Sequence, residues 1–369
     1  MGHGEMPSAS ALSQRRQLLD PDIFKRINNL FVSAFDDHTT INGYHILAQD
    51  GSDINIPFMD DKTKTEKHDA KSFCQYHVNA LYDCLNKVFY DWSIDVASKK
   101  REVNALISIL KDRNYPQNSI FTADRGYESY NLIAHFIEND IKFVIRVKDI
   151  HTKVGLMTNV RTEEGAFDMR INRTLTSLQT KEIKADKEKY IFVPSTSNFD
   201  FLDENRDFYD LSFRAVRFKI SEDTYETVVT NLSEEEFKTE DFKELYHYRW
   251  NEETAFNKLK YTIGLVYFHA RKRKLIQQEI NAAFLMYNVS EVIIRNIDLK
   301  KNKKPKLEYD YKPNFSSAVT NIRLYLRKKI SMKELIHRIK KFLVGQRPER
   351  SFERNIKGQS CKPLNYRTS

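Results

Sequence analysis

The stretch that decides the fold spans residues 119–147 and reads SIFTADRGYESYNLIAHFIENDIKFVIRV. Its beginning, Ser119 to Ala123, predicts a short strand that ends at the polar turn Asp124-Arg125-Gly126-Tyr127. A helix is expected to follow through Ile137, and Phe143 to Val147 predicts another strand. A strand, a helix and a strand in close succession indicate a mixed α/β sheet.

The flanking sequence extends this pattern in both directions. On the N-terminal side we expect a helix from Pro21 to about Phe35, a strand from Tyr44 to Ala48, a turn at Asp50-Gly51-Ser52, paired strands within 76–95 and a helix over 99–113. On the C-terminal side we expect a β-rich insertion with strands at 190–193, 211–220 and 225–232, and then helices at about 239–262, 274–296, 315–328 and 331–344. A chain of this length is expected to form two or three structural units.

Positive charge is concentrated at the C-terminal end. The chain has a net charge of +9, but residues 301–369 hold 19 Lys and Arg against 5 Asp and Glu, so the first 300 residues are net negative. Apolar residues such as Ile322, Leu335 and Ile339 are interleaved with these basic residues, which favours folded helices with basic faces. The expected partner is a polyanion such as DNA, although a solubilising tail or an anionic-membrane patch would carry the same charge.

Several classes of protein are excluded by composition. No apolar run approaches the roughly 18 residues that a membrane-spanning helix needs. The segment Met1 to Ser10 lacks the layout of a signal peptide. Three cysteines (Cys74, Cys84 and Cys361) provide no disulfide framework and match no zinc-site spacing, which indicates a reducing cytoplasm.

Three carboxylates have the placement that phosphodiester chemistry requires. Such chemistry uses two divalent cations about 3.5–4 Å apart, held by carboxylates from separate rigid elements. Asp50 and Asp124 each follow an apolar strand, and Glu253 lies on an expected helix. On that helix Tyr246, Arg249, Glu253 and Lys260 fall within roughly a 60° arc, so they share one face.

Other acidic residues compete for the same roles, because most of the 51 Asp and Glu residues are expected to be solvated surface groups. Asp53 is the nearest rival of Asp50, and Asp83, Asp91 and Asp95 are further candidates. Glu252, beside Glu253, leaves open which of the two glutamates faces the metals, although the shared helix face favours Glu253. We expect Trp250, in the same helix, to pack in the core rather than to stack on a flipped base.

These residues resemble the motifs of bacterial insertion-sequence transposases of the "insertion-sequence four" family. The spacing Tyr246-x2-Arg249-x3-Glu253-x6-Lys260 is similar to that family's Tyr-Arg-Glu-Lys signature. The resemblance covers nearly the whole chain and continues in five further stretches, namely Asp50-Gly51-Ser52, Asp124-Arg125-Gly126-Tyr127, Phe143 to Lys148, and the segments 11–16 and 347–352.

The resemblance implies a ribonuclease H-like core interrupted by a β-strand insertion between the second Asp and the Glu. It implies that Asp50, Asp124 and Glu253 bind Mg²⁺, which Mn²⁺ would be able to replace, and that the enzyme cleaves DNA and then transfers the cut strands. Residues expected to contact the DNA backbone are Tyr246, Arg249, Lys260, Arg125 and Arg146, with ordinary ion pairing equally expected for the last two. The implied partners are double-stranded DNA, as terminal inverted repeats and target, and a second copy of the chain in a synaptic homodimer associated with the nucleoid.

On this basis we divide the chain into five parts. They are an N-terminal helical DNA-binding remnant (1–43), the first part of the core (44–150), the β-rich insertion (151–236), the core segment with the catalytic helix (237–300) and a basic helical C-terminal region (301–369). Two departures from the family bear on activity: Glu252 stands where the family has an apolar residue, and only 49 residues precede Asp50. A catalytically impaired transposase that only binds DNA is therefore the alternative function, and a structure-directed nuclease is a third.

Overall fold

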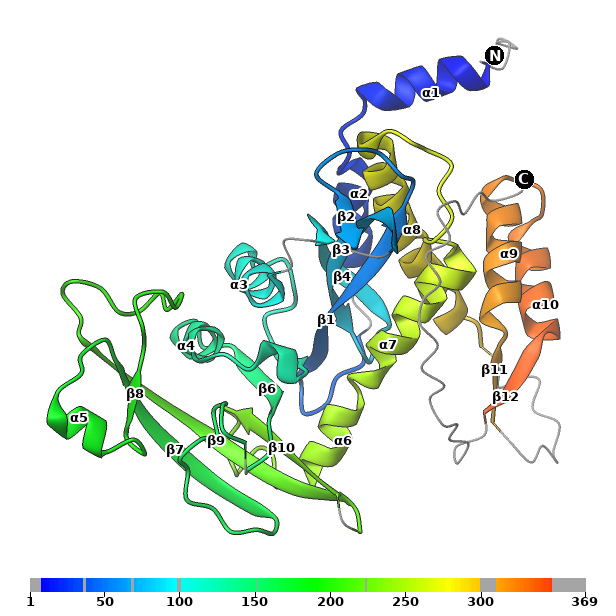
Figure 1. The fold of residues 1–369 in the computed structure, drawn as a ribbon. Helices are drawn as coiled ribbons and strands as arrows, with labels where there is room; N and C mark the ends of the chain where they lie inside the picture. The colour runs from blue at the N-terminus through cyan, green and yellow to red at the C-terminus, as the bar shows by residue number, and fades with distance from the viewer. Residues whose placement is uncertain are drawn as a thin grey trace.

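A large mixed sheet organises the structure. The computed structural model describes residues 8–35, 38–67, 70–97, 101–150, 152–222, 224–298 and 310–346. Within these ranges ten strands form one sheet in the order β2-β3-β1-β5-β6-β10-β9-β7-β8, with β4 also paired to β3 (Figure 1). The strands are β1 (His45–Ile56), β2 (Lys64–Lys67), β3 (Ala70–Asp83), β4 (Val88–Val96), β5 (Ser119–Ala123), β6 (Lys142–Val147), β7 (Phe167–Thr176), β8 (Tyr190–Phe192), β9 (Phe208–Ser221) and β10 (Thr224–Thr230).

Five neighbouring strands of this sheet, in the order β4-β3-β1-β5-β6, form the core. Strand β3 is antiparallel to β1 and β4, whereas β1, β5 and β6 run parallel to one another. The parallel strands are joined by helical crossovers, which is how parallel neighbours must be connected. This arrangement confirms the ribonuclease H-like α/β fold that was expected from the sequence.

Apolar residues on both faces of the sheet explain why helices cover it on two sides. Along β1, Ile46 and Ala48 belong to one buried cluster and Leu47 to another, as the two-residue period of a strand requires. The first cluster packs against α6 (Asp241–His247), α7 (Trp250–Asn257) and α8 (Arg273–Arg295), and the second against α3 (Glu102–Asp112) and α4 (Tyr130–Glu138). In Figure 1, β1 accordingly lies between α3 and α7.

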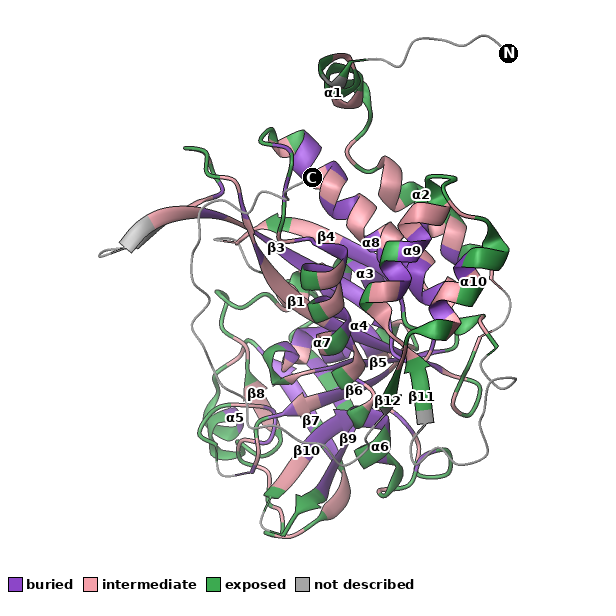
Figure 2. Ribbon diagram, turned by 90° about the vertical axis from the view of Figure 1, so that its right-hand side faces the viewer, coloured by how far each residue is buried: buried purple, intermediate pink, exposed green. Residues whose placement is uncertain are grey.

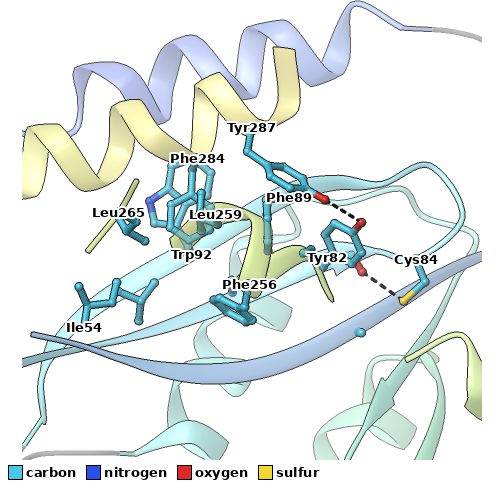
Figure 3. Close-up of a cluster of buried hydrophobic side chains, with 14 of the residues drawn as sticks. Ile54, Tyr82, Cys84, Phe89, Trp92, Phe256, Leu259, Leu265, Phe284 and Tyr287 are labelled. Atoms are coloured by element: carbon cyan, nitrogen blue, oxygen red, sulfur yellow. Dashed lines mark hydrogen bonds between the residues drawn. The ribbon is translucent and has the colours of Figure 1, made fainter. Parts of the chain in front are cut away.

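The first of these clusters fixes α8 to the sheet through aromatic side chains (Figure 3). The rings of Trp92 on β4 and Phe284 on α8 are stacked with their centroids 4.4 Å apart. The indole N–H of Trp92 donates to Asn281 Oδ1 at 2.7 Å, and the hydroxyls of Tyr82 and Tyr287 are 3.1 Å apart. Their polar atoms are thus satisfied inside an apolar layer, which makes the contact both large and specific in orientation.

The turn predicted at Asp50-Gly51-Ser52 is wrong, because β1 continues through it to Ile56. The local sequence is turn-prone, but β3 pairs with it residue by residue, opposing Asp50 with Ala80 and Gly51 with Asn79. Gly51 does not have a positive φ, so it takes the extended conformation that the ladder needs. Tertiary pairing overrides the local preference here.

The segment between the core strands and the long helices is β-rich, as predicted, but it is not a separate sheet. Strand β10 pairs with β6 of the core, and β9, β7 and β8 follow outward. Strand β7 was not predicted, because its sequence FDMRINRTLT is interrupted by polar residues. One of these, Arg173, is buried and donates to the backbone oxygen of Thr158.

The predicted helices are found at the expected positions in the chain, but their bounds and continuity differ from the prediction. The single helix expected over 239–262 consists of α6, α7 and a π-helical stretch, Lys258–Ile263. The expected C-terminal helices are α9 (Phe315–Leu326) and α10 (Met332–Lys341), of which the second ends early because Leu343–Gln346 forms strand β12, paired with β11 (Asp310–Pro313). The short helix α5 (Lys181–Ala185) lies in the β-rich segment.

At the N-terminal end, α1 (Ala9–Leu18) precedes α2 (Ile23–Ser33), and only the second was predicted. Much of α1 is exposed, and so is much of α10 (Figure 2). The described helices include none that is long and apolar enough to cross a membrane. Cys74 and Cys84 are both buried and free, whereas Cys361 and the family-like segment 347–352 lie outside the described residues.

Candidate active site

Two aspartates follow the last paired residues of two neighbouring parallel strands. The ladder between β1 and β5 ends with Gln49 opposite Ala123. Asp50 and Asp124 are the next residue on each strand, so both lie at the point where β5 leaves the sheet. Equal register on parallel strands places their side chains on the same face. Both aspartates were singled out from the sequence, and in the structure both directly follow the last pair of the β1–β5 ladder.

A tight turn holds Asp124 in place. Its Oδ1 accepts a hydrogen bond from Gly126 N at 2.8 Å and so caps the short 3₁₀ turn Arg125–Tyr127. A Cβ added at Gly126 would lie 2.9 Å from the same oxygen. A side chain at position 126 would therefore displace the Asp124 carboxylate from the orientation it has at the end of the strand.

Asp50 lies deeper and beside another negative charge. Its Oδ1 accepts from Gly51 N at 2.8 Å. The pKa of Asp50 is raised to about 6: burial is the largest cause, the Asp124 carboxylate acts in the same direction, and the Gly51 N–H and Arg249 act in the opposite direction. Asp50 is thus a carboxylate that a neighbouring positive charge would stabilise in its ionised form.

Two residues of the Tyr-Arg-Glu-Lys spacing, Arg249 and Lys260, lie near enough to Asp50 for their charges to interact with it. Arg249 Nη2 donates to Glu253 Oε1 at 3.2 Å, and the guanidinium lies 5.6 Å from the centre of the Tyr246 ring. Burial alone would lower the pKa of Arg249, but Tyr246, Asp50 and Glu253 raise it. The guanidinium is therefore electrostatically linked to two of the three candidate carboxylates.

Lys260 approaches the same place from the π-helical stretch. Its Nζ donates to the backbone oxygen of Asp53 at 3.0 Å. Burial lowers the pKa of Lys260, whereas Asp53 and Asp50 raise it. π-helical turns are often found at functional sites, and here the wider turn carries a basic group to the strand that bears Asp50.

Glu252 and Glu253 differ in solvent exposure. Glu252 is fully buried, and its pKa is raised by burial first and then by Asp50. The Glu253 side chain is 25% exposed and pairs with Arg249. Only Glu253 is open to a substrate, which favours it as the third carboxylate, while Glu252 fills the apolar position that the family resemblance implies.

The rival aspartates have other partners. Asp83 is completely buried and lies 2.7 Å from His45 Nδ1, and Asp91 pairs with Lys25 at 2.5 Å. The exposed Asp95 accepts a hydrogen bond from the Ser93 hydroxyl at 3.1 Å. Asp53 is near the site, but its carboxylate accepts from His77 Nδ1 at 2.7 Å. These contacts leave Asp50 as the aspartate of β1 that faces Asp124.

The two remaining predicted DNA contacts, Arg125 and Arg146, differ in exposure and in ion pairing. Arg125 is exposed on the turn after Asp124, whereas Arg146 pairs with Glu226 at 3.0 Å. The core position expected for Trp250 is wrong, because 48% of this residue is exposed. It follows Arg249, whose guanidinium lies 5.9 Å from the indole centre. The Trp250 indole is therefore exposed next to Arg249 rather than packed in the core.

The chemistry of the donors fits a hard divalent cation. Asp50, Asp124 and Glu253 offer carboxylate oxygens alone, which is the donor set that Mg²⁺ prefers. Burial of Asp50 beside Asp124 is an arrangement that a cation would stabilise. Within the described residues, no three His, Cys, Asp or Glu side chains are already gathered closely enough to hold an ion.

A family model and a solved structure match the chain. The model of the family described as "Transposase DDE domain" matches residues 41–289, a range that includes all three candidate carboxylates and most of α8. No curated protein was found to match the chain. A solved structure, "Cryo-EM structure of piggyBac transposase synaptic complex with hairpin DNA (SNHP)", is similar with a TM-score of 0.42 and 13% identity over 94% of this chain and 67% of that chain, a likeness too low to carry an argument.

Proposed function

Since the chain belongs to the family of transposases with a DDE domain, we propose that it cleaves DNA at the ends of an insertion sequence and joins those ends to target DNA. Asp50, Asp124 and Glu253 are the catalytic carboxylates of this proposal. The observation that carries it is the equal register of Asp50 and Asp124 on two parallel strands, facing a helix that bears Arg249 and Glu253. Asp50, Asp124 and Glu253 come from three separate elements, which is the origin that two-metal phosphodiester chemistry requires of its carboxylates.

Mg²⁺ is the proposed cofactor, and Mn²⁺ is expected to replace it. Asp50, Asp124 and Glu253 would hold it, and when bound it would activate the attacking oxygen and offset the charge on the leaving oxygen. Arg249 would grip a phosphate with its planar guanidinium, and Lys260 would act as a point charge. Because both side chains are nearly buried, they would contact only a phosphate that lies directly over the carboxylates.

The proposed partners are double-stranded DNA with terminal inverted repeats, target DNA and a second copy of the chain in a synaptic homodimer. The basic residues of 301–369 support a polyanion partner. The Tyr-Arg-Glu-Lys spacing supports membership of the "insertion-sequence four" group within the wider family. We accordingly propose that the protein acts on nucleoid DNA in the cytoplasm.

The test is a cleavage and joining assay on DNA that carries the inverted repeats flanking the gene, with Mg²⁺ present. Asp124→Asn and Glu253→Gln should each lower product formation by at least about a hundredfold, because a catalytic metal ligand is lost while the shape is kept. Asp112→Asn and Glu204→Gln are matched controls at exposed positions and should retain activity.

Full activity in either active-site variant would remove the triad assignment. Specific DNA binding without cleavage at any concentration of Mg²⁺ or Mn²⁺ would instead support the alternative function, a DNA-binding remnant. Cleavage without joined product would support the structure-directed nuclease.

A further inference from the structure

We propose that Glu128 is a positioning residue for DNA binding: it closes the loop that follows β6 and so holds the exposed Lys153 near the turn that carries Asp124, where Lys153 contacts a phosphate of the DNA backbone. This inference rests on the proposed function, because it names a further contact surface for the same substrate. Glu128 directly follows the turn Arg125–Tyr127, and neither Glu128 nor Lys153 belongs to a motif that was singled out from the sequence.

The two carboxylate oxygens of Glu128 accept hydrogen bonds from the two ends of this loop. Oε2 accepts from Lys148 N at 3.0 Å, directly after β6, and Oε1 accepts from Leu156 N at 2.6 Å. Hydrogen bonds to a carboxylate are stronger than those between neutral groups. A single side chain thus brings the ends of the loop together, as in a compact surface loop.

Gly155 gives the Glu128 carboxylate the space for this contact. Its φ is +149°, which L side chains rarely adopt, and a Cβ at this position would lie 2.5 Å from Glu128 Oε1. The missing side chain lets the carboxylate reach the N–H of the next residue, Leu156. The backbone N–H of Glu128 in turn donates to Arg125 O at 3.4 Å. Glu128 therefore connects the loop after β6 to the turn after Asp124.

The charges that this connection brings to the surface are positive. The acidic group within the loop, Asp149, is paired with the buried guanidinium of Arg217 at 2.8 Å, and the Glu128 carboxylate accepts from backbone N–H groups. Lys153 in the loop and Arg125 in the turn are both exposed. Two cations next to the strand end that bears Asp124 complement the phosphates of a DNA strand that lies over the carboxylates.

A purely structural role for Glu128 makes a different prediction. Ile150, Leu156 and Met157 are buried in the core and would then hold the loop without Glu128. In that case Glu128→Ala, which removes a negative charge, would leave the affinity for DNA unchanged or raise it. If Glu128 positions Lys153, the same substitution weakens DNA binding although it removes a charge that repels phosphate. The sign of the change in affinity separates the two roles.

The experiment measures the affinity of the full-length protein for labelled inverted-repeat DNA by fluorescence anisotropy, with a chelator present to prevent cleavage. At 0.1 M salt we expect Lys153→Ala to weaken binding by about five- to tenfold and to reduce the slope of log affinity against log salt by about one, because one phosphate contact is lost. Glu128→Ala should weaken binding in the same direction. The double variant should bind no more weakly than Lys153→Ala, because Glu128 acts through Lys153.

Glu163→Ala and Lys187→Ala are matched controls at exposed positions of the segment between β6 and β9. Glu163→Ala removes the same charge as Glu128→Ala and should leave the affinity unchanged or slightly higher. Lys187 is flanked by Asp186 and Glu188, and Lys187→Ala should bind DNA like the unchanged protein. If Glu128→Ala does not fold, Glu128→Gln provides the answer, because it keeps one acceptor oxygen and should give a smaller loss of affinity.

Four outcomes would overturn the inference. They are an unchanged affinity and salt slope in Lys153→Ala, an unchanged or higher affinity in Glu128→Ala, losses that add in the double variant, and an equal loss in Lys187→Ala, which would show a general charge effect. In each of these cases the proposed function stands if the unchanged protein still cleaves and joins inverted-repeat DNA. If the unchanged protein neither binds nor cleaves this DNA, the proposed function is refuted and this inference with it.

Discussion

At the scale of single residues, the protonation of Asp50 couples folding to pH. Its pKa of about 6 lies above the ordinary value of 3.8 because the side chain is buried near Asp124. The folded chain therefore retains a proton that the unfolded chain releases. The stability from this proton is fully present below about pH 4 and is lost as pH rises through 6.

We therefore expect the metal-free protein to lose up to about 3 kcal/mol of unfolding free energy from Asp50 alone between pH 4 and pH 7. Asp50→Asn should lack this part of the pH dependence and be the more stable protein at pH 7. Urea unfolding in the presence of a chelator at several pH values measures the difference between the two. Parallel curves for both proteins would show that Asp50 is not held in a buried, repulsive environment.

Single residues also differ in how well the sequence predicts their position and contacts. Asp124 was predictable, because an apolar strand followed by a glycine turn specifies its own local geometry. The contacts of Glu128 with the backbone of Lys148 and Leu156 were not, because these residues meet only through the pairing of β5 with β6. The exposure of Trp250 was missed for a similar reason, since burial on a helix depends on what packs against it.

At the scale of elements, α8 packs on the core sheet through an aromatic cluster that also contains Phe256 of α7. Phe284 is fully buried, stacks on Trp92 and meets Phe89 edge-on with centroids 4.8 Å apart. Phe284→Ala should lower the unfolding free energy by about 3–5 kcal/mol, because a large cavity is left in the aromatic layer. Phe192→Ala at the partly exposed end of β8 is the control and should cost less than about 1 kcal/mol. A small loss in Phe284→Ala would mean that α8 can repack without this ring.

Elements were predicted well in type and less well in extent. Strand β5 was predicted with its observed bounds, because short apolar runs between turn residues are locally specified. The length of β1 and the existence of β7 depended on partner strands that are distant in sequence. The break of the long helix into α6, α7 and a π-helical stretch could not be read from periodicity, because the buried residues Ala255, Leu259 and Ile263 keep the four-residue spacing of an α-helix.

At the scale of the whole molecule, the uneven distribution of charge predicts that DNA binding depends on salt concentration. The excess of basic residues lies in 301–369, and the rest of the chain is net negative. Binding to DNA should therefore weaken steeply with salt, by about a thousandfold between 50 and 200 mM if six or more phosphates are contacted. Fluorescence anisotropy with labelled inverted-repeat DNA measures this slope. An affinity that hardly changes with salt would exclude the basic region as the contact surface.

The pairing of β10 with β6 has a mechanical consequence. Backbone hydrogen bonds run without interruption from the strand that precedes Asp124 to the outermost strand of the β-rich segment. A hinge between that segment and the carboxylates would have to break a strand ladder. In the proposed function, the outer strands would therefore keep a constant distance from the carboxylates, and adjustment to different DNA ends would have to come from the DNA or from the loops.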